Sequence, residues 1–294
     1  MRKGWQMRLC GKLKIFFLAA ALLWAVVSSF PEGPSPARAA RKPERLIAMT
    51  LATAEMLLAL APRERIVGLH KLAGHRGYSN VAGKVGEIPL IGSAPELIIS
   101  FRPDMVFVAS YSSAAFLNHL RAAGAPVSKF SAFSGMEDVF ANIEKMGRLI
   151  GEEDKAQKLI KDTKERIHAI RSRIPKNAKP PRILTLVRGG WVTGGGTSHD
   201  ALIRLAGGEN VAAEHGIRGA RRVSAEQVIA WNPDVILVGA NPESGASMKN
   251  AIRANGVYAP LREKKIVEIP YPRFSSVSQY IVDGLDDLVR GLYR

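Results

Sequence analysis

Cysteine is almost absent from this sequence: Cys10 is the only one among 294 residues. It precedes an apolar run, residues 15–27, that follows a basic head and is too short to span a bilayer comfortably. After a stretch rich in Pro, Ser and Gly, Ala37-Arg38-Ala39 matches the small-residue motif at which secretory signals are cleaved. We therefore expect residues 1–39 to be a signal peptide rather than an uncleaved anchor. The mature chain should then lack disulfides, cysteine–metal sites and a lipidated cysteine.

Acidic residues are scarce relative to basic ones. The chain holds 42 Lys and Arg against 26 Asp and Glu, and without residues 1–39 its net charge is still +11. Basic proteins often bind nucleic acid, but neither a long Lys/Arg tract nor zinc-finger spacing occurs, and an exported protein rarely meets nucleic acid. The charge therefore favours an anionic ligand or an anionic membrane surface, and we expect no nucleic-acid partner.

Signature motifs of catalysis are also missing. The sequence contains no G-x-S-x-G, H-E-x-x-H or G-x-x-x-x-G-K-[ST]. The glycines of residues 189–196 lie between an expected strand and an expected helix, but they do not form G-x-G-x-x-G, and close packing beside a ligand accounts for them. His199 and Asp200 are adjacent at a helix start, so their side chains point apart. These absences predict a binding protein rather than an enzyme.

One short pattern occurs twice, 130 positions apart. Residues 93–108 read SAPELIISFRPDMVFV, and residues 223–238 read VSAEQVIAWNPDVILV. In each copy a glutamate (Glu96, Glu226) opens an apolar stretch of helical length, a Pro-Asp pair ends it, and a β-branched run follows. Each copy predicts a helix, a turn and a buried strand, and a repeat at this separation predicts two similar lobes.

Strands and helices alternate around both copies of the repeat, which predicts mostly parallel sheets covered on both faces. Between the copies, residues 136–174 form a long helical run with one expected break at Gly151. We therefore expect a first β/α lobe at 40–135, a linking helix at 136–174 and a second β/α lobe at 175–294. Other expected elements are an amphipathic helix at 51–65, a loop at 70–91, a Gly-rich turn at 188–198, a basic loop at 210–223 and a C-terminal helix at 276–293.

This arrangement resembles the substrate-binding proteins of cobalamin and ferric-siderophore ABC importers, a group that includes haem carriers. The resemblance covers nearly the whole mature chain and is clearest in four segments, RLIAMTLATAEMLLALAPRERIVGL, APELIISFRPDMVFV, GGTSHDALIRLAGGENVA and VSAEQVIAWNPDVILV. It implies an α/β fold of the class III periplasmic-binding type, with two doubly wound parallel-sheet lobes joined by a single long helix.

The resemblance also implies a function. It indicates a periplasmic monomer that carries an iron complex or corrinoid to an ABC permease dimer in the inner membrane, without a cofactor of its own. Haem ranks below cobalamin and siderophores, because the tyrosine-bearing motif of haem-binding relatives is not recognisable. The alternatives are a haem-binding importer component and, further off, an exported metallochaperone or enzyme on the same fold.

Two glutamates are candidates for docking onto the permease. In the family that the chain resembles, one glutamate at the tip of each lobe contacts basic permease residues, and the motif match carries this role to Glu96 and Glu226. Helix capping is the competing interpretation, because Ser93 and Glu96 are spaced as a capping box. In the second copy, however, Ser224 is the expected cap and Gln227 holds the box position. Capping alone would not align the two acids, so docking is favoured.

Ligands of open α/β sheets bind at the carboxyl ends of strands, which selects particular loops. The candidate ligand-binding residues are Thr50, His70, Tyr78 and Tyr111 in the first lobe, and Arg188, Trp191, Arg218, Arg221, Tyr271 and Arg273 in the second. Aromatic rings can stack on a flat ligand and arginines can pair with its negative charge. If the cargo is haem, His70 and Tyr78 are potential iron ligands. For any single residue, packing under a loop or a solvated charge is an equally frequent role. The histidines are scattered, so no metal site is expected.

Overall fold

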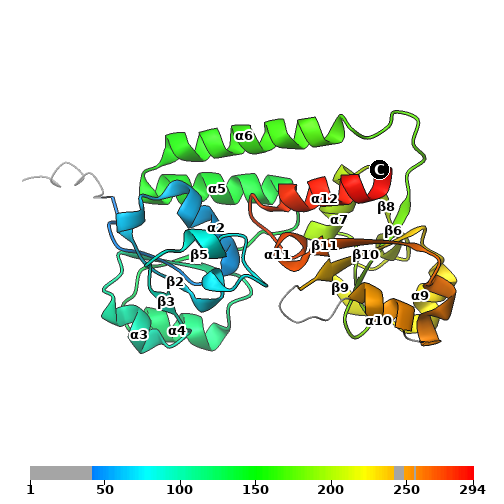
Figure 1. Cartoon of the computed structure of the whole chain (residues 1–294). Helices are drawn as coiled ribbons and strands as arrows, with labels where there is room; N and C mark the ends of the chain where they lie inside the picture. Colours follow the sequence, from blue (N-terminus) through cyan, green and yellow to red (C-terminus); the bar gives the residue numbers. More distant parts are fainter. Residues whose placement is uncertain (1–41, 242–247, 255) are drawn as a thin grey trace, which may run out of the picture. The chain divides into compact units, whose positions relative to one another are not determined.

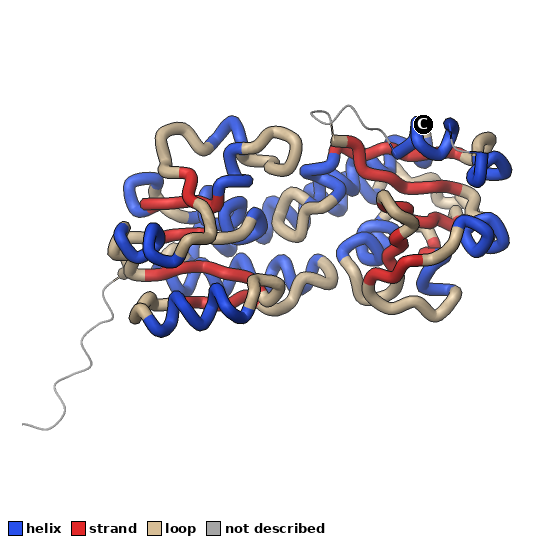
Figure 2. The backbone as a smooth tube through the Cα atoms, turned by 90° about the horizontal axis from the view of Figure 1, so that it is seen from below, coloured by secondary structure: helices blue, strands red, loops and turns tan. Residues whose placement is uncertain are grey.

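The computed structural model describes residues 42–241, 248–254 and 256–294, so the expected signal peptide, its cleavage site and Cys10 lie outside the described residues. From Lys42 onward the described residues form one compact unit. Within these ranges, no helix is both long and apolar enough to cross a membrane. The strands of this unit form two separate groups (Figure 2).

The first sheet consists of five parallel strands in the order β3-β2-β1-β4-β5. Its strands are β1 (Leu46–Ala48), β2 (Ile66–His70), β3 (Leu90–Ile91), β4 (Met105–Ala109) and β5 (Val127–Phe130), and its helices are α2 (Leu51–Leu60), α3 (Pro95–Ser100) and α4 (Ala114–Ala122). The strand order reverses between β1 and β4, which opens a crevice at the carboxyl ends of these two strands. The expected loop at 70–91 contains 3-10 turns and ends in the short strand β3.

The second sheet runs β11-β10-β6-β7-β9, with β8 beside β6. Its strands are β6 (Arg182–Val187), β7 (Trp191–Thr193), β8 (Glu209–Asn210), β9 (Ala220–Arg222), β10 (Val235–Ala240) and β11 (Lys265–Pro270). All pair in parallel except β7 and β9, which are antiparallel. The expected turn at 188–198 and loop at 210–223 were therefore wrong. Gly189 and Gly190, with φ of 81° and 79°, turn the chain back onto β6, and strands of three residues are too short to show a period-2 pattern.

Six helices of the described residues accompany this second sheet: α7 (Ser198–Leu205), α8 (Val211–Glu214), α9 (Ala225–Trp231), α10 (Met248–Ala254), α11 (Tyr271–Phe274) and α12 (Ile281–Tyr293). The C-terminal helix therefore begins at Ile281 rather than at Ser276. The serines that precede it are buried and hydrogen-bonded to the first lobe, as described below.

The helical run between the sheets is split into two helices. α5 (Met136–Ile150) ends at Gly151, whose φ of 69° is the left-handed conformation that glycine adopts without strain. α6 (Glu153–Arg171) then packs along α5, and it alone leads from the first sheet to the second (Figure 1). The break thus lies at the residue that the sequence predicted. The predicted fold class is confirmed, with two doubly wound α/β lobes joined by one long helix.

One hydrophobic core reaches from the first sheet to the second. It includes Phe107 of β4, Ile143 of α5, Ile160 of α6 and Leu285 of α12, together with Leu237 of β10. Because the two lobes share this core with the helices between them, large independent motions of the lobes are disfavoured. The lobe limits at residues 135 and 175 stay a proposal.

The repeated Pro-Asp pair has the same structural role in both lobes. Asp104 Oδ2 accepts hydrogen bonds from the backbone N–H groups of Glu44 (2.7 Å) and Arg45 (2.9 Å), just before β1. Asp234 Oδ2 accepts one from the N–H of Arg182 (2.9 Å), at the start of β6. In each lobe the aspartate fastens the first strand beside the strand of the repeat, β4 or β10. Satisfying these backbone donors explains why each copy carries an aspartate.

Candidate functional site

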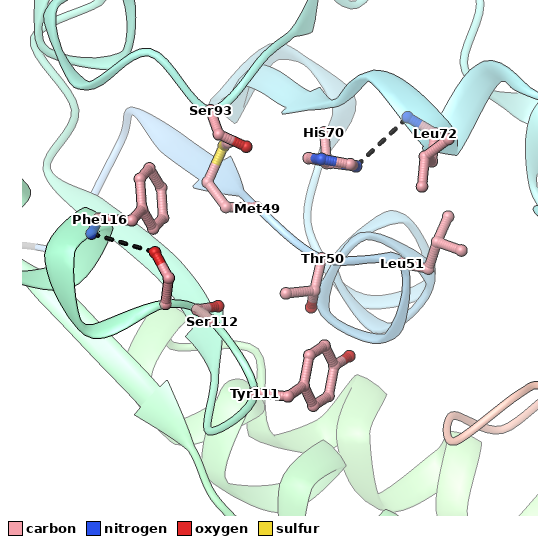
Figure 3. Close-up of a pocket in the computed structure, with 10 residues that line it drawn as sticks. Met49, Thr50, Leu51, His70, Leu72, Ser93, Tyr111, Ser112 and Phe116 are labelled. Carbon is pink, nitrogen blue, oxygen red and sulfur yellow. Dashed lines mark hydrogen bonds between the residues drawn. The ribbon is translucent and has the colours of Figure 1, made fainter.

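A pocket of about 410 Å³ lies at the carboxyl ends of β1, β2 and β4, where the strand order of the first sheet reverses. Three predicted ligand-binding residues line it: Thr50 follows β1, His70 ends β2, and Tyr111 follows β4. Figure 3 shows their side chains around one opening, with Ser93 and Phe116 on the far side. The rule that ligands bind at strand ends therefore brought three distant residues together correctly.

The hydrogen bonds of these side chains limit their chemistry. His70 Nδ1 accepts a bond from the N–H of Leu72 (3.3 Å), so the neutral ring carries its proton on Nε2 and presents a donor to the pocket. Burial, and secondarily the charge of Lys71, lower the pKa of His70, which keeps the ring neutral. Iron ligation through Nε2 would require the other tautomer, so the geometry disfavours His70 as an iron ligand.

Tyr111 lies at the mouth of this pocket. Its side chain is 60% exposed, and its ring centroid is 5.5 Å from that of Phe133. Thr50, in contrast, is buried and caps α2: its Oγ1 accepts a bond from the N–H of Thr53 (3.3 Å). Tyr111 is therefore presented to an incoming ligand, whereas the Thr50 hydroxyl is partly used within the fold.

A second pocket of about 520 Å³ lies at the carboxyl ends of β6, β10 and β11. Arg188 and Tyr271 of the second lobe line it, together with Tyr78 of the first lobe. The rings of Tyr78 and Tyr271 meet edge to face, with centroids 5.5 Å apart. Two predicted residues far apart in the sequence thus come together where the lobes touch. Among the described residues, Arg188 has no carboxylate within ion-pair distance.

Arg188 also lines a third hollow of about 450 Å³ beside Arg222, whose Nε donates to the carbonyl of Gly189 (2.9 Å). The basic segment of β9 therefore reaches the neighbourhood of the second pocket through Arg222. The ligand-binding residue that the sequence predicts on β9 is its neighbour Arg221, which does not line this hollow.

Four of the predicted ligand-binding residues lie elsewhere. Trp191 of β7, 47% exposed, and the exposed Arg218 and Arg221 are not among the residues lining the first or second pocket. Arg273 lines a separate hollow of about 280 Å³ and forms an ion pair with Asp287 (2.9 Å). That hydrogen bond raises the pKa of the guanidinium, and Arg273 packs as part of the lobe. Its assignment to the ligand pocket is not supported by the geometry.

Two titratable side chains, one buried and one half-buried, were not predicted as functional residues. Glu55 of α2 is 2% exposed, and His199 of α7 packs on Phe274, a residue that lines the second pocket. The helix that the sequence predicts at 51–65 ends at Leu60, and it is buried over seven of its ten residues rather than amphipathic. Glu55 is the only charged residue in α2, and such an isolated acid in an apolar helix is a sequence signal for a buried, hydrogen-bonded carboxyl.

The two aligned glutamates lie in equivalent positions of short helices. Glu96 is in the first turn of α3 and Glu226 in the first turn of α9, and both are exposed. The expected capping box at Ser93 is wrong: α3 is capped at Ala94 with no side-chain hydrogen bond. The box at Ser224 is present, with Gln227 as its partner. Neither glutamate holds the N3 position of a capping box, although the Glu226 carboxylate bonds Ser224 and its own backbone N–H, which lowers its pKa.

Clusters of metal-binding side chains do not occur in the described part of the chain: no three His, Cys, Asp or Glu side chains there are placed to hold a metal ion. The two pockets at the strand ends are lined by aromatic, hydroxyl and basic side chains, which makes them candidate surfaces for a ligand.

Similar proteins include two binders of corrinoids. A cobalamin-binding protein of Halobacterium salinarum is 24% identical over 204 residues, which are 69% of this chain and 55% of that protein. The matched part thus spans about half of the halobacterial protein's length. A vitamin B12-binding protein of Vibrio parahaemolyticus is 26% identical over 226 residues, 74% of this chain and 80% of that protein.

Solved structures share the fold. A possible iron-binding, periplasmic solute-binding protein of Staphylococcus epidermidis has a TM-score of 0.73 at 20% identity, and the match covers 86% of this chain and 100% of that one. The periplasmic heme-binding protein RhuT of Roseiflexus sp. RS-1 has a TM-score of 0.71 at 24% identity, over 85% of this chain and 98% of that one. A family model described as periplasmic binding protein matches residues 46–271, so the chain belongs to the periplasmic binding protein family.

Proposed function

We propose that the chain is an exported substrate-binding protein that captures a cobalamin or ferric-siderophore type ligand between its lobes and delivers it to an ABC permease. One observation carries the proposal: the strands of both sheets end in pockets, and Tyr78 of one lobe meets Tyr271 of the other beside Arg188. A bulky ligand with a flat or anionic part suits this surface, because rings provide contact area and Arg188, which has no carboxylate partner among the described residues, provides charge.

The names of the relatives support the same ligand class. Two are cobalamin- or vitamin B12-binding proteins, and an uncharacterised relative of Bacillus subtilis, 22% identical over 86% of this chain, is named as an ABC transporter substrate-binding lipoprotein. We accordingly assign a binding role without catalysis, a permease as partner, and export to the periplasm through cleavage after Ala39. We also propose that the protein is a monomer, and the shared core between the lobes supports modest lobe motion.

Haem is the second candidate cargo, and the exposure of Tyr111 favours it. A tyrosine phenolate is a known axial ligand of haem iron, and Tyr111 is presented at the mouth of the first pocket. Its hydroxyl is hydrogen-bonded to Thr50 and desolvation raises its pKa, so iron would have to displace both this bond and the phenol proton. Hemin should then give a Soret band that changes in Tyr111→Phe but not in His70→Gln.

Calorimetric titration of the mature protein tests the proposal. Cyanocobalamin, hemin, a ferric catecholate and a ferric hydroxamate siderophore are titrated separately, and one of them should bind saturably with a 1:1 stoichiometry. Arg188→Gln should weaken binding of an anionic ligand, while Arg262→Gln, an exposed arginine that lines neither the first nor the second pocket, is the matched control. Absence of saturable binding for all four compounds would contradict the proposed function.

We further propose that Glu96 and Glu226 dock the protein onto the permease. Both are exposed, they occupy equivalent helices of the two lobes, and neither is used for a capping box. Two separate carboxylates on one rigid body set the orientation on a partner with matching positive charges, and they increase the rate of association more than its strength.

A further inference from the structure

The carboxyl of Glu55 lies at the contact between the two lobes. It belongs to α2 of the first lobe, and it is almost completely buried. No lysine, arginine or histidine is among its hydrogen-bond partners in the described residues. Burying a carboxyl without a counter-charge is unfavourable, and an apolar side chain of similar size is usually better for stability. The positions of its hydrogen-bond partners indicate why a carboxyl is buried here.

Those partners come from both lobes. In the first lobe, Asn80 donates to Oε1 from its backbone N–H (3.2 Å) and from Nδ2 (2.8 Å). In the second, Ser278 Oγ donates to Oε2 (2.5 Å), and Ser276 Oγ lies 3.4 Å from the same oxygen. Ser278 Oγ also accepts a bond from the N–H of Tyr280 (3.2 Å), which leaves its hydroxyl proton available for the carboxyl.

Two further bonds tie the same segments together. Gln279 Nε2 donates to the backbone carbonyl of Glu55 (2.9 Å), and Asn80 Nδ2 donates to the carbonyl of Pro272 (2.8 Å). The Glu55 carboxyl thus occupies the centre of a network that joins α2, the segment before Asn80, and the chain from Pro272 to Gln279. Every member of the network that contacts the carboxyl is buried or half-buried.

The two segments held by Glu55 are those that carry the facing tyrosines of the second pocket. Tyr78 lies two residues before Asn80, and Tyr271 lies one residue before Pro272. Their rings form the edge-to-face contact between the lobes. A displacement of either segment would therefore change the distance between these rings and the width of the second pocket.

We propose that Glu55 is a positioning residue, which sets the spacing of the lobes and holds Tyr78 and Tyr271 together at the ligand pocket. The effect on ligand binding rests on the proposed function, whereas the effect on lobe spacing does not. Glu55 acts through the two segments and need not touch the ligand. Loss of the carboxyl releases donors on both lobes, so the lobes sample a wider range of separations, and only a fraction of the molecules keeps the pocket complete.

Interlobe distances measured by electron–electron double resonance test this proposal. The mature chain has no cysteine, so spin labels can be placed at Asn118→Cys on α4 and Arg253→Cys on α10, both exposed. Glu55→Ala should broaden and shift the distance distribution without ligand. Glu55→Gln should restore most of it, because one oxygen still accepts from Asn80 and the amide can donate to Ser278. Ser278→Ala, which removes the 2.5 Å bond alone, should give an intermediate distribution.

Asp200 provides the matched control. It is also a buried acid, but its oxygens accept from Asn210 Nδ2 (3.0 Å) and Arg204 Nε (3.1 Å), both within the second lobe. Asp200→Ala should lower stability and leave the interlobe distances unchanged. If Glu55→Ala behaves like Asp200→Ala, the acid is merely structural and the proposal is overturned. If Glu55→Ala does not fold, Ser278→Ala decides, and an unchanged distance distribution in that variant overturns the proposal.

Ligand affinity gives the second readout. For the compound that binds the wild type, Glu55→Ala should raise Kd about tenfold if only one molecule in ten keeps the binding-competent spacing. Changed distances with unchanged affinity would refute the link to the pocket. If none of the compounds binds, the proposed function is refuted, and the interlobe distances alone decide the role of Glu55.

Discussion

The stability of the protein should depend on the protonation of His199 under mildly acidic conditions. The His199 ring packs on Phe274, with centroids 4.3 Å apart, and Nε2 donates to the Phe274 carbonyl (3.0 Å). Dense surrounding protein lowers the pKa of His199 from 6.5 to about 4, because desolvation disfavours the charged ring, and the hydrogen bond to the carbonyl offsets only part of this effect.

The direction of the pH effect follows from the two protonation states. The unfolded chain takes up a proton at this histidine as pH falls through 6.5, whereas the folded chain does so only near 4. The stabilisation is therefore present above pH 6.5 and is lost as pH falls from about 6.5 to 4. Between pH 7.5 and 5, proton linkage lowers the free energy of unfolding by at most about 2 kcal/mol, since His199 is only half-buried.

Urea unfolding of the mature protein at pH 7.5, 6 and 5 measures this loss. His199→Gln keeps an amide donor near the Phe274 carbonyl but cannot titrate, so its free energy of unfolding should fall by about 2 kcal/mol less than that of the wild type over the same range. His119→Gln, at an exposed position on α4, should follow the wild-type profile. Parallel profiles for the wild type and His199→Gln would refute the reasoning.

Three other predictions follow from the contacts described above. Arg65→Ala should destabilise the fold by about 3–5 kcal/mol in urea unfolding, because the buried guanidinium bonds Glu152 (3.0 Å) and the carbonyls of Pro43 and Ile150. Lys158→Ala, which breaks an exposed pair, should leave the free energy of unfolding nearly unchanged. Charge reversal of Glu96 and Glu226 should weaken docking onto the permease in proteoliposomes and leave ligand affinity nearly unchanged. If docking and ligand affinity fall equally, the two glutamates are structural or pocket residues. Arg188→Ala should weaken the binding of an anionic ligand about tenfold. Arg273→Ala, which breaks the pair with Asp287, should lower the stability of the protein and leave its ligand affinity nearly unchanged. Loss of affinity in Arg273→Ala but not in Arg188→Ala would contradict our placement of the pocket.

The sequence predicted the lobes and much of the first pocket, because these depend on local patterns and one general rule. The repeat located β4 and β10, and the residues after β1, β2 and β4 had to converge wherever these strands are parallel neighbours. The short strands β7 and β9 were missed, since pairing of three-residue segments depends on the turn at Gly189 and Gly190 and on neighbouring strands. Arg273 lies outside the first and second pockets, because its pairing with Asp287 is a contact between α11 and α12 that no local pattern specifies.

By itself, the sequence determined the two-lobed α/β architecture, the position of the helix break at Gly151 and the alignment of Glu96 with Glu226. These features follow from hydrophobic periodicity, backbone preferences and internal repetition, all of which are local in the chain. Only the tertiary structure decided that Tyr78 meets Tyr271 and that Glu55 joins Asn80 to Ser278. Those residues lie about 200 positions apart along the chain, and no local pattern specifies which buried donor will satisfy a buried carboxyl when two lobes pack together.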